Sequence, residues 1–320
     1  HGGAKTRTYG DSAQRGTDFV RRAAWYALGI GDPKFVHASM LPFVTTTWRM
    51  ADVVIALALG PRGPAPYDVR QRRMGLAHAG FAKPPHYHLR TDFGGILRTS
   101  HVTPDFIVSA LQLEARPELE WAAISAQNRW MGAIFRGHAD ARIYPQGVSL
   151  TGESVYNQHW GVQARGTLIA QQLKTSRHVD EWRVFFARAG LAAPVREGEW
   201  FFAEAAGAYA AVRVVQGGAV FLPDDASRFG RWLKCADAFS PVILEVAPKT
   251  AGVSFADFRR AVQALPVRVE HQVLHYTSRA GDRLVFDLSQ QRPPLVNGKP
   301  VDLAPENVFD GLTVEDFRAT

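Results

Sequence analysis

The sequence predicts an α+β protein, in which N-terminal helices are followed by a large antiparallel β-sandwich domain. Apolar residues recur at helical spacing early in the chain, whereas short, often alternating segments bounded by Gly, Pro, Asp or Asn follow after Gly95. Only one clear helix, from Ser254 to Leu265, interrupts these segments. Many short strands with a single helix favour an antiparallel sandwich over a parallel sheet. We therefore expect a helical segment at residues 1–85 and a β-sandwich domain at residues 86–320.

The helical segment is expected to contain three helices. Thr17 and Asp18 can cap the first, whose apolar residues keep helical spacing until Gly29 stops it. The second covers residues 46–59 and is apolar on most faces, which predicts packing between other helices. The third is short and basic and covers residues 67–74. The stretch KPPHYHLR that follows is expected to be an extended linker, because two prolines cannot continue a helix.

The sandwich domain is expected to contain short strands separated by turns. The glycines of GDR and VNGKPV have the chemistry of hairpin turns. The strands are expected at GILRTSHV, FIVSALQL, WAAISAQN, MGAIF, HWGVQA, TLIAQQL, EWRVFFA, GEWFFAEA, AYAAVRVV, GAVFLP, PVILEVA, VEHQVLHYTS and DRLVFDL.

Composition excludes several classes of protein. Hydrophobic residues make up 46% of the 320 residues, which is too much apolar material for a disordered chain. The net charge of +7 favours an anionic partner, but the basic residues form no run of five, so we expect no nucleic-acid partner. The longest apolar stretch, from Val53 to Leu59, is far shorter than the ~20 residues of a membrane span. Cys235 is the single cysteine, so no internal disulfide can form and we expect an inert thiol.

Two regions, one at the start of the chain and one at the start of the proposed sandwich, carry candidate functional residues. Lys5, Arg7 and Tyr9 lie in a Gly-rich loop before a helix, where an anion can bind, and a flexible terminus is the alternative. His86 and His88 alternate in an extended segment and so point the same way, as a metal pair or an acid–base pair requires. No third ligand has a diagnostic spacing, so we expect no cofactor and keep a divalent metal as the alternative. The same region contains Tyr87, Arg90, Arg98 and His101.

Two predicted strands share an unusual polar and aromatic texture, which a plain core would not need. Aromatic faces stack on pyranose rings, and amides and Arg give directional hydrogen bonds to hydroxyls and carboxylates. Sugar binding therefore explains the pattern, with Trp130 and Trp160 as ordinary core residues in the alternative interpretation. The residues concerned are Gln127, Asn128, Arg129, Trp130 and His138 in one strand and Tyr156, Asn157, Gln158, His159 and Trp160 in the other.

Familiar catalytic motifs such as G-x-S-x-G and H-E-x-x-H are missing from the sequence. A pair of glycosidase carboxylates has no fixed spacing in sequence. The acids nearest the unusual strands are Asp92, Asp105, Asp140 and Glu153, and the sequence does not rank them.

The layout as a whole resembles the heparinase II/III-like and related polysaccharide lyases. The resemblance is carried by HYHLRTDF, ILRTSHVTPDFIVSALQ, SAQNRWMGAIF, YNQHWGVQARGTLI and PPLVNGKPVD, and it covers most of the chain. It implies an α/α toroid joined to an antiparallel β-sandwich. Because fewer helices precede the sheet than a toroid needs, and the chain begins HGGAKTRTYG without Met, we expect a processed or truncated part of a longer enzyme.

The resemblance also implies a reaction, the β-elimination of a uronate-containing polysaccharide. The enzyme must neutralise the uronate carboxylate and place a base beside C5. Tyr156 or Tyr9 is then the base or acid, with a histidine as its partner. The implied partner histidines are His88, His101 and His159, and the implied substrate-binding residues are Asn128, Arg129, Trp130, Arg90, Arg7 and Trp160.

An acidic polysaccharide substrate implies a secreted or periplasmic enzyme, and the positive net charge would attract such a polymer. Two alternatives remain open: a glycoside hydrolase on a similar scaffold, which needs two carboxylates, and a non-catalytic carbohydrate-binding β-domain. The sequence carries no signal for an oligomeric state.

Overall fold

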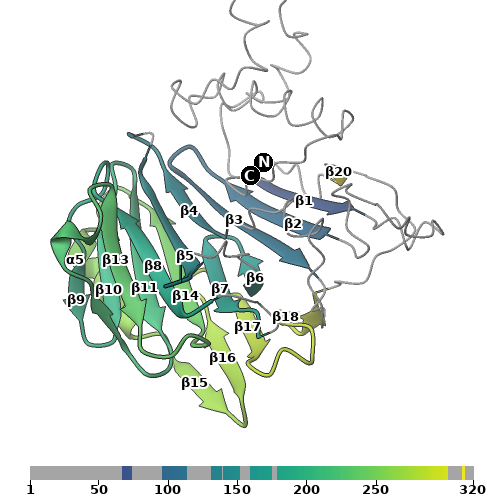
Figure 1. Ribbon diagram of the computed structural model, residues 1–320. Coiled ribbons are helices and arrows are strands. Elements are labelled where there is room, and N and C mark those ends of the chain that lie inside the picture. The colour runs from purple at the N-terminus through teal and green to yellow at the C-terminus, as the bar shows by residue number, and fades with distance from the viewer. Residues whose placement is uncertain are drawn as a thin grey trace, which may run out of the picture.

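The computed structural model describes residues 67–73, 96–113, 131–138, 140–151, 159–174, 179–301 and 312–313. Most of these residues lie in antiparallel strands, which form three sheets. Strands β1 and β2 lie at one side of the molecule, and helix α5 and strand β9 lie at the other (Figure 1). No helix among the described residues is long and apolar enough to cross a membrane.

The largest sheet has nine strands in the order β12-β13-β8-β5-β4-β3-β2-β1-β20. Strand β5 alternates, with every second residue buried, whereas six of the seven residues of β8 are buried. The strands are β1 (Tyr67–Arg73), β2 (Ile96–Val102), β3 (Phe106–Leu113), β4 (Gly132–Phe135), β5 (Arg142–Val148), β8 (Glu181–Ala187), β12 (Ala219–Phe221), β13 (Gly230–Cys235) and β20 (Leu312–Thr313).

The second sheet has six strands in the order β6-β7-β14-β11-β10-β9. All six residues of β7 are buried, and so are all residues of β14 except Pro248. Such continuous burial shows that this sheet is covered on both faces. The strands are β6 (His159–Ala164), β7 (Thr167–Gln172), β9 (Val195–Glu197), β10 (Trp200–Glu204), β11 (Ala208–Val214) and β14 (Val242–Pro248).

The third sheet has five short strands, and it is joined in sequence to the six-stranded sheet through helix α5. Its strands are β15 (Val267–Glu270), β16 (Val273–Thr277), β17 (Arg283–Asp287), β18 (Leu295–Val296) and β19 (Lys299–Pro300); α5 is Phe255–Gln263, and a short 3₁₀ helix, η3, is Asp224–Ala226.

Two hydrophobic cores hold the layers together. The first lies between the nine-stranded and six-stranded sheets and includes Phe186 and Leu244. The second lies on the other face of the six-stranded sheet, where Phe202 and Ile243 meet Phe286 of the third sheet and Phe258 of α5. The six-stranded sheet is therefore the middle layer of three.

The predicted helix near residue 254 is confirmed, and its start has the expected cap. The Ser254 hydroxyl accepts a hydrogen bond from the Asp257 N–H at 3.1 Å, and the Asp257 carboxylate accepts one from the Ser254 N–H at 2.9 Å. This reciprocal pair is a capping box. Phe258 and Val262, four residues apart, form the buried face of the helix.

The predicted α+β class is wrong, although its β-rich antiparallel part is confirmed. Residues 67–74 were expected to form a helix, but Tyr67–Arg73 is strand β1 and pairs with β2 along its whole length. Seven consecutive cross-strand pairs outweigh the weak helical preference of so short a segment. Helix α5 is the only α-helix in the described part of the chain, so the structure contains no toroid there. The helices expected before residue 60 lie outside the described residues.

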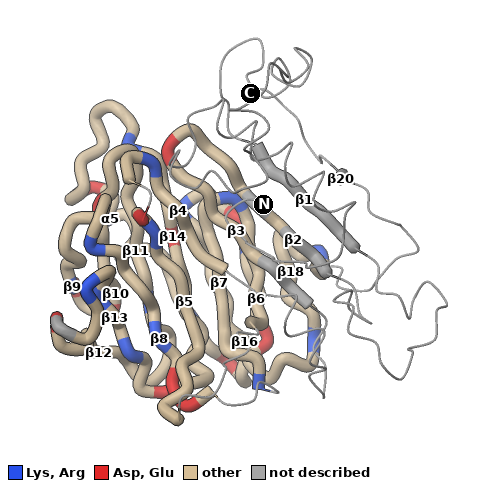
Figure 2. Tube along the Cα trace, turned by 45° about the horizontal axis from the view of Figure 1, so that its top comes forward, with Lys and Arg blue, Asp and Glu red and all other residues tan. Residues whose placement is uncertain are grey.

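Charged residues are spread over the sheets. Figure 2 shows Lys and Arg positions scattered along the described trace and interspersed with Asp and Glu. The Lys and Arg positions are therefore not gathered in one block of the described trace.

Candidate functional site

Strands β2, β4 and β6 all begin at the same end of the structure. β2 and β4 both pair antiparallel with β3, so they run in the same direction. Met131, just before β4, lies against Gly161 near the start of β6, where a Cβ would come 2.8 Å from the Met131 Sδ. Phe106, which begins β3, lies instead beside Gly166, just beyond the end of β6. β6 therefore runs parallel to β2 and β4, and we call their common starting end the His159 end.

Most predicted site residues lie outside the described residues, but their sequence positions lead into this end. Tyr156 precedes β6 by three residues, Trp130 precedes Met131 directly, and His88 and Arg90 precede β2. The three segments that the sequence singles out therefore join the described sheets at one end. The predicted site residues outside the described part are Arg7, Tyr9, His88, Arg90, Asn128, Arg129, Trp130 and Tyr156.

His159 is the first residue of β6 and its side chain lies in the interior, 3% exposed. The imidazole ring packs edge-on against Trp182 of the nine-stranded sheet, with ring centroids 5.0 Å apart. Its cross-strand partner is Gln172 of β7. The position between two sheets fixes the orientation of the ring and leaves it little contact with solvent.

Unused hydrogen-bonding capacity surrounds His159. Trp182 and Gln172 are both fully buried, and within the described part of the chain neither the Trp182 indole N–H nor either amide atom of Gln172 has a hydrogen-bond partner. Each buried polar group left in this state costs about 1–3 kcal/mol. The interior at the His159 end is therefore polar beyond what packing requires.

Trp160, predicted to bind substrate, points to the opposite face of the six-stranded sheet. Its side chain is 4% exposed and belongs to the core between this sheet and the third sheet. This position is the one that the alternative interpretation, an ordinary core residue, describes.

His101 lies at the opposite end of the same strands. It is half-buried near the end of β2, with its ring centroid 5.9 Å from that of Phe106. Phe106 in turn lies beside the turn that follows β6. Because this turn is six residues beyond His159, the two ends of β6 are about 20 Å apart. The structure therefore does not bring His101 and His159 together at one scissile bond.

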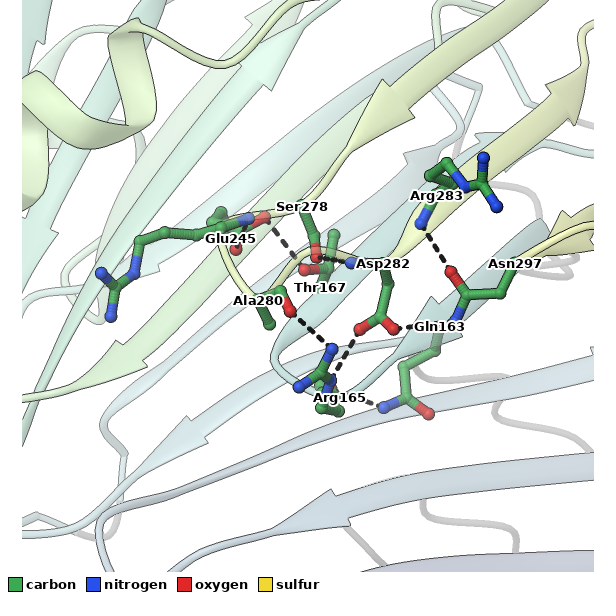
Figure 3. Close-up of polar contacts among 10 residues, drawn as sticks. Gln163, Arg165, Thr167, Glu245, Ser278, Ala280, Asp282, Arg283 and Asn297 are labelled. Atoms are coloured by element: carbon green, nitrogen blue, oxygen red, sulfur yellow. Dashed lines mark hydrogen bonds and ion pairs between the residues drawn. The ribbon is translucent and has the colours of Figure 1, made fainter.

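A hydrogen-bonded network occupies the His101 end, around the turn between β6 and β7 (Figure 3). Arg165 donates through Nε to the Asp282 carboxylate at 2.7 Å and through Nη2 to the Ala280 carbonyl at 2.6 Å. Asn297 donates to the other Asp282 oxygen at 3.0 Å. Burial raises the pKa of Asp282, but the hydrogen bonds from Arg165 and Asn297 and the charges of Arg165 and His101 lower it more, so the net pKa is below its usual range.

Glu245 is a second carboxylate of the same region, and it is enclosed between the six-stranded and third sheets. It accepts hydrogen bonds from the Thr167 hydroxyl and the Tyr276 hydroxyl, each at 2.9 Å, and from the Arg279 N–H at 3.0 Å. Burial raises the pKa of Glu245 to about 7, against the opposing effect of the Tyr276 and Thr167 hydrogen bonds. Glu245 is 2% exposed, so it lacks the access to substrate that a glycosidase acid needs.

Sequence reasoning missed Arg165, Glu245 and Asp282. A signal for Glu245 was present, since it is the only charged residue in the apolar strand VILEVAP. Of the acids that the sequence suggested, Asp105 is half-buried against Gly207 and Asp140 is half-buried before β5. Asp92 and Glu153 lie outside the described residues.

No group of three or more His, Cys, Asp or Glu residues within the described ranges could hold a metal ion. The predicted pair His86 and His88 lies outside those ranges. Cys235 is buried in the first core, and burial raises the pKa of its thiol to about 12. A thiol with this pKa is not a nucleophile at neutral pH.

Comparison with known proteins found no matching family model, no matching curated protein and no matching solved structure.

Proposed function

We propose that the protein is a polysaccharide lyase that cleaves a uronate-containing polysaccharide by β-elimination, with its reacting centre at the His159 end. The observation that supports this proposal is the common start of β2, β4 and β6, because the segments rich in Tyr, His, Asn and Arg lead into these strands. The buried polar groups around His159 also lie at this end. The fold by itself does not determine a function.

The proposed reaction needs a base, an acid and a group that neutralises the uronate carboxylate. A base removes the proton from C5 of the uronate, the C4–O bond breaks, and an acid protonates the departing oxygen, which leaves a C4=C5 double bond in the product. We assign the base to Tyr156 and carboxylate neutralisation to Asn128 and Arg129. His159 is enclosed, so its role is to position the strand that follows Tyr156.

The test uses the full chain with alginate, polygalacturonate, heparin and glucuronan as separate substrates. Ultraviolet absorbance of the unsaturated uronate product reports elimination. We expect Tyr156→Phe to lose at least about a hundredfold in rate, as removal of a general base does. His101→Gln is the matched control, because His101 lies about 20 Å from the proposed centre and should leave the rate within about twofold.

Three results would contradict the proposal. New reducing ends without ultraviolet absorbance would identify a hydrolase, and glycan binding without either product would identify a non-catalytic binding domain. Equal loss of activity in Tyr156→Phe and His101→Gln, with both variants folded, would move the reacting centre away from the His159 end.

A further inference from the structure

An aromatic row crosses the outer face of the nine-stranded sheet. Tyr144 pairs with Phe185, and Phe185 pairs with Trp232, so the three rings come from the neighbouring strands β5, β8 and β13 in register. Their ring centroids are 5.0 Å apart for Tyr144 and Phe185 and 4.9 Å apart for Phe185 and Trp232. The row covers about two strand spacings, or about 10 Å, which exceeds one sugar ring.

The three rings lie on the opposite side of their strands from Ile143 and Val184. Phe185 is 3% exposed and belongs to the first core, and Tyr144 and Trp232 are partly buried against it. Ile143 and Val184 are fully buried in the first core, and side chains alternate along a strand. Phe185 forms the floor of the row: its ring lies over Gly230, where a Cβ would come 2.2 Å from the ring. Tyr144 and Trp232 flank this floor and are partly exposed.

Polar and basic side chains run alongside the aromatic row. Gln146, Arg183 and Lys234 form a second cross-strand row, two residues further along the same strands. Glu181 pairs with both Arg183 and Lys234. These cations are therefore held in place beside the rings.

Arg142 adds a cation that no carboxylate neutralises within the described part of the chain. Its guanidinium carbon lies 5.9 Å from the ring centroid of Tyr144 and 5.8 Å from that of Phe185. Its Nε is buried and has no hydrogen-bond partner among the described residues. With Arg183 and Lys234 the surface carries three cations against the single carboxylate of Glu181.

We propose that this surface, the outer ledge of Arg142, Tyr144, Phe185 and Trp232, is a second binding site for an anionic polysaccharide, separate from the reacting centre. Pyranose rings would stack on Trp232, and carboxylates of the polymer would pair with Arg142 and the basic row. The ledge would hold a long substrate on the enzyme between cleavage events. The choice of an anionic glycan rests on the proposed function and on the excess of positive charge at the ledge.

The test measures equilibrium binding of the full chain to polygalacturonate and alginate by affinity electrophoresis and calorimetry, with neutral dextran as the reference polymer. We expect Trp232→Ala and Arg142→Gln each to weaken binding about tenfold, which is typical of the loss of one charged or stacking contact. Arg228→Gln is the control, because Arg228 is exposed outside the ledge and the variant loses the same charge. Binding to the wild type should weaken with added salt. Thermal unfolding verifies that each variant is folded.

Several outcomes would overturn the proposal that the ledge binds an anionic polysaccharide. These are equal affinity for dextran, no binding of either anionic polymer by the wild type, unchanged affinity in folded Arg142→Gln and Trp232→Ala, or an equal loss in Arg228→Gln. A dimer that Trp232→Ala dissociates, without any effect on glycan affinity, would assign the ledge to a second copy of the chain. Formation of the ultraviolet-absorbing product separates the two proposals. Elimination without binding at the ledge supports the lyase proposal and contradicts the ledge proposal. Binding at the ledge without elimination contradicts only the lyase proposal.

Discussion

The unfolding free energy of Glu245→Gln, measured relative to that of the wild type, should increase as the pH rises from acidic to neutral values. The carboxylate is enclosed by Thr167, Tyr276 and Arg279, and all three donate hydrogen bonds to it. The variant Glu245→Gln keeps the shape of the side chain but cannot ionise. The amide nitrogen of Gln is a donor and cannot accept a hydrogen bond as a carboxylate oxygen does, so some of these hydrogen bonds must change direction or be lost. The cost in stability does not depend on pH.

The size of the effect follows from the pKa of Glu245. Burial raises this pKa from 4.5 to about 7, and one pKa unit corresponds to about 1.4 kcal/mol. The folded protein binds the proton more tightly than the unfolded chain, so the contribution of Glu245 to stability is complete below pH 4.5 and is lost as the pH rises to about 7. The wild type should therefore lose on the order of 3 kcal/mol across this interval through Glu245 alone.

Urea unfolding followed by tryptophan fluorescence at several pH values from 4.5 to 8 measures the effect. The difference in unfolding free energy between Glu245→Gln and the wild type should grow in favour of the variant up to about pH 7 and then stay constant. Glu270→Gln, at an exposed position of β15, should show no such growth. A constant difference between Glu245→Gln and the wild type at every pH would refute the reasoning.

Three further predictions concern the interior. Gln172→Met should raise the unfolding free energy by about 1–3 kcal/mol, because it removes two buried polar atoms without partners, and urea unfolding would detect this. Gly161→Ala should lower it by about 1–3 kcal/mol, because the new Cβ would come within 2.8 Å of Met131 Sδ and 2.9 Å of the Ile169 carbonyl oxygen; an unchanged midpoint would contradict the close approach of β6 to Met131. Cys235 should react with a thiol reagent at pH 8 only after unfolding, because burial raises its pKa to about 12; rapid reaction of the folded protein would contradict this.

Local signals in the sequence predicted much of the β-structure. The apolar run FIVSALQL is strand β3, and the cap at Ser254 marks the start of α5. The helix predicted over YDVRQRR was wrong. The charged residues of this segment give no strand pattern, and the strand forms through its pairing with β2 rather than through its own preferences. The third sheet was also missed as a separate layer, since which strands share a sheet depends on contacts distant in sequence.

The candidate site was predictable only in part. The sequence singled out His159 and Trp160 as neighbours of one kind, but successive residues of a strand face opposite sides, and the two side chains lie in different cores. Likewise, His101 and His159 have the same chemistry, and only the direction of the strands separates them. The Glu245 carboxylate accepts a hydrogen bond from Tyr276, which is 31 residues away in sequence, and no local sequence pattern indicates that contact.

The two ends of β6 should respond to mutation in opposite ways. At the His101 end, Asp282 and Glu245 each accept several hydrogen bonds, so removal of a partner such as Arg165 leaves a buried carboxylate uncompensated and reduces stability. At the His159 end, the buried amide of Gln172 and the indole N–H of Trp182 have no hydrogen-bond partner to lose in the described ranges. Buried polar groups without hydrogen-bond partners lower stability, so they are expected where function, rather than folding, maintains them. Substitutions that remove a partner at the His101 end should therefore lower the unfolding free energy, whereas an apolar substitution of Gln172 should raise it.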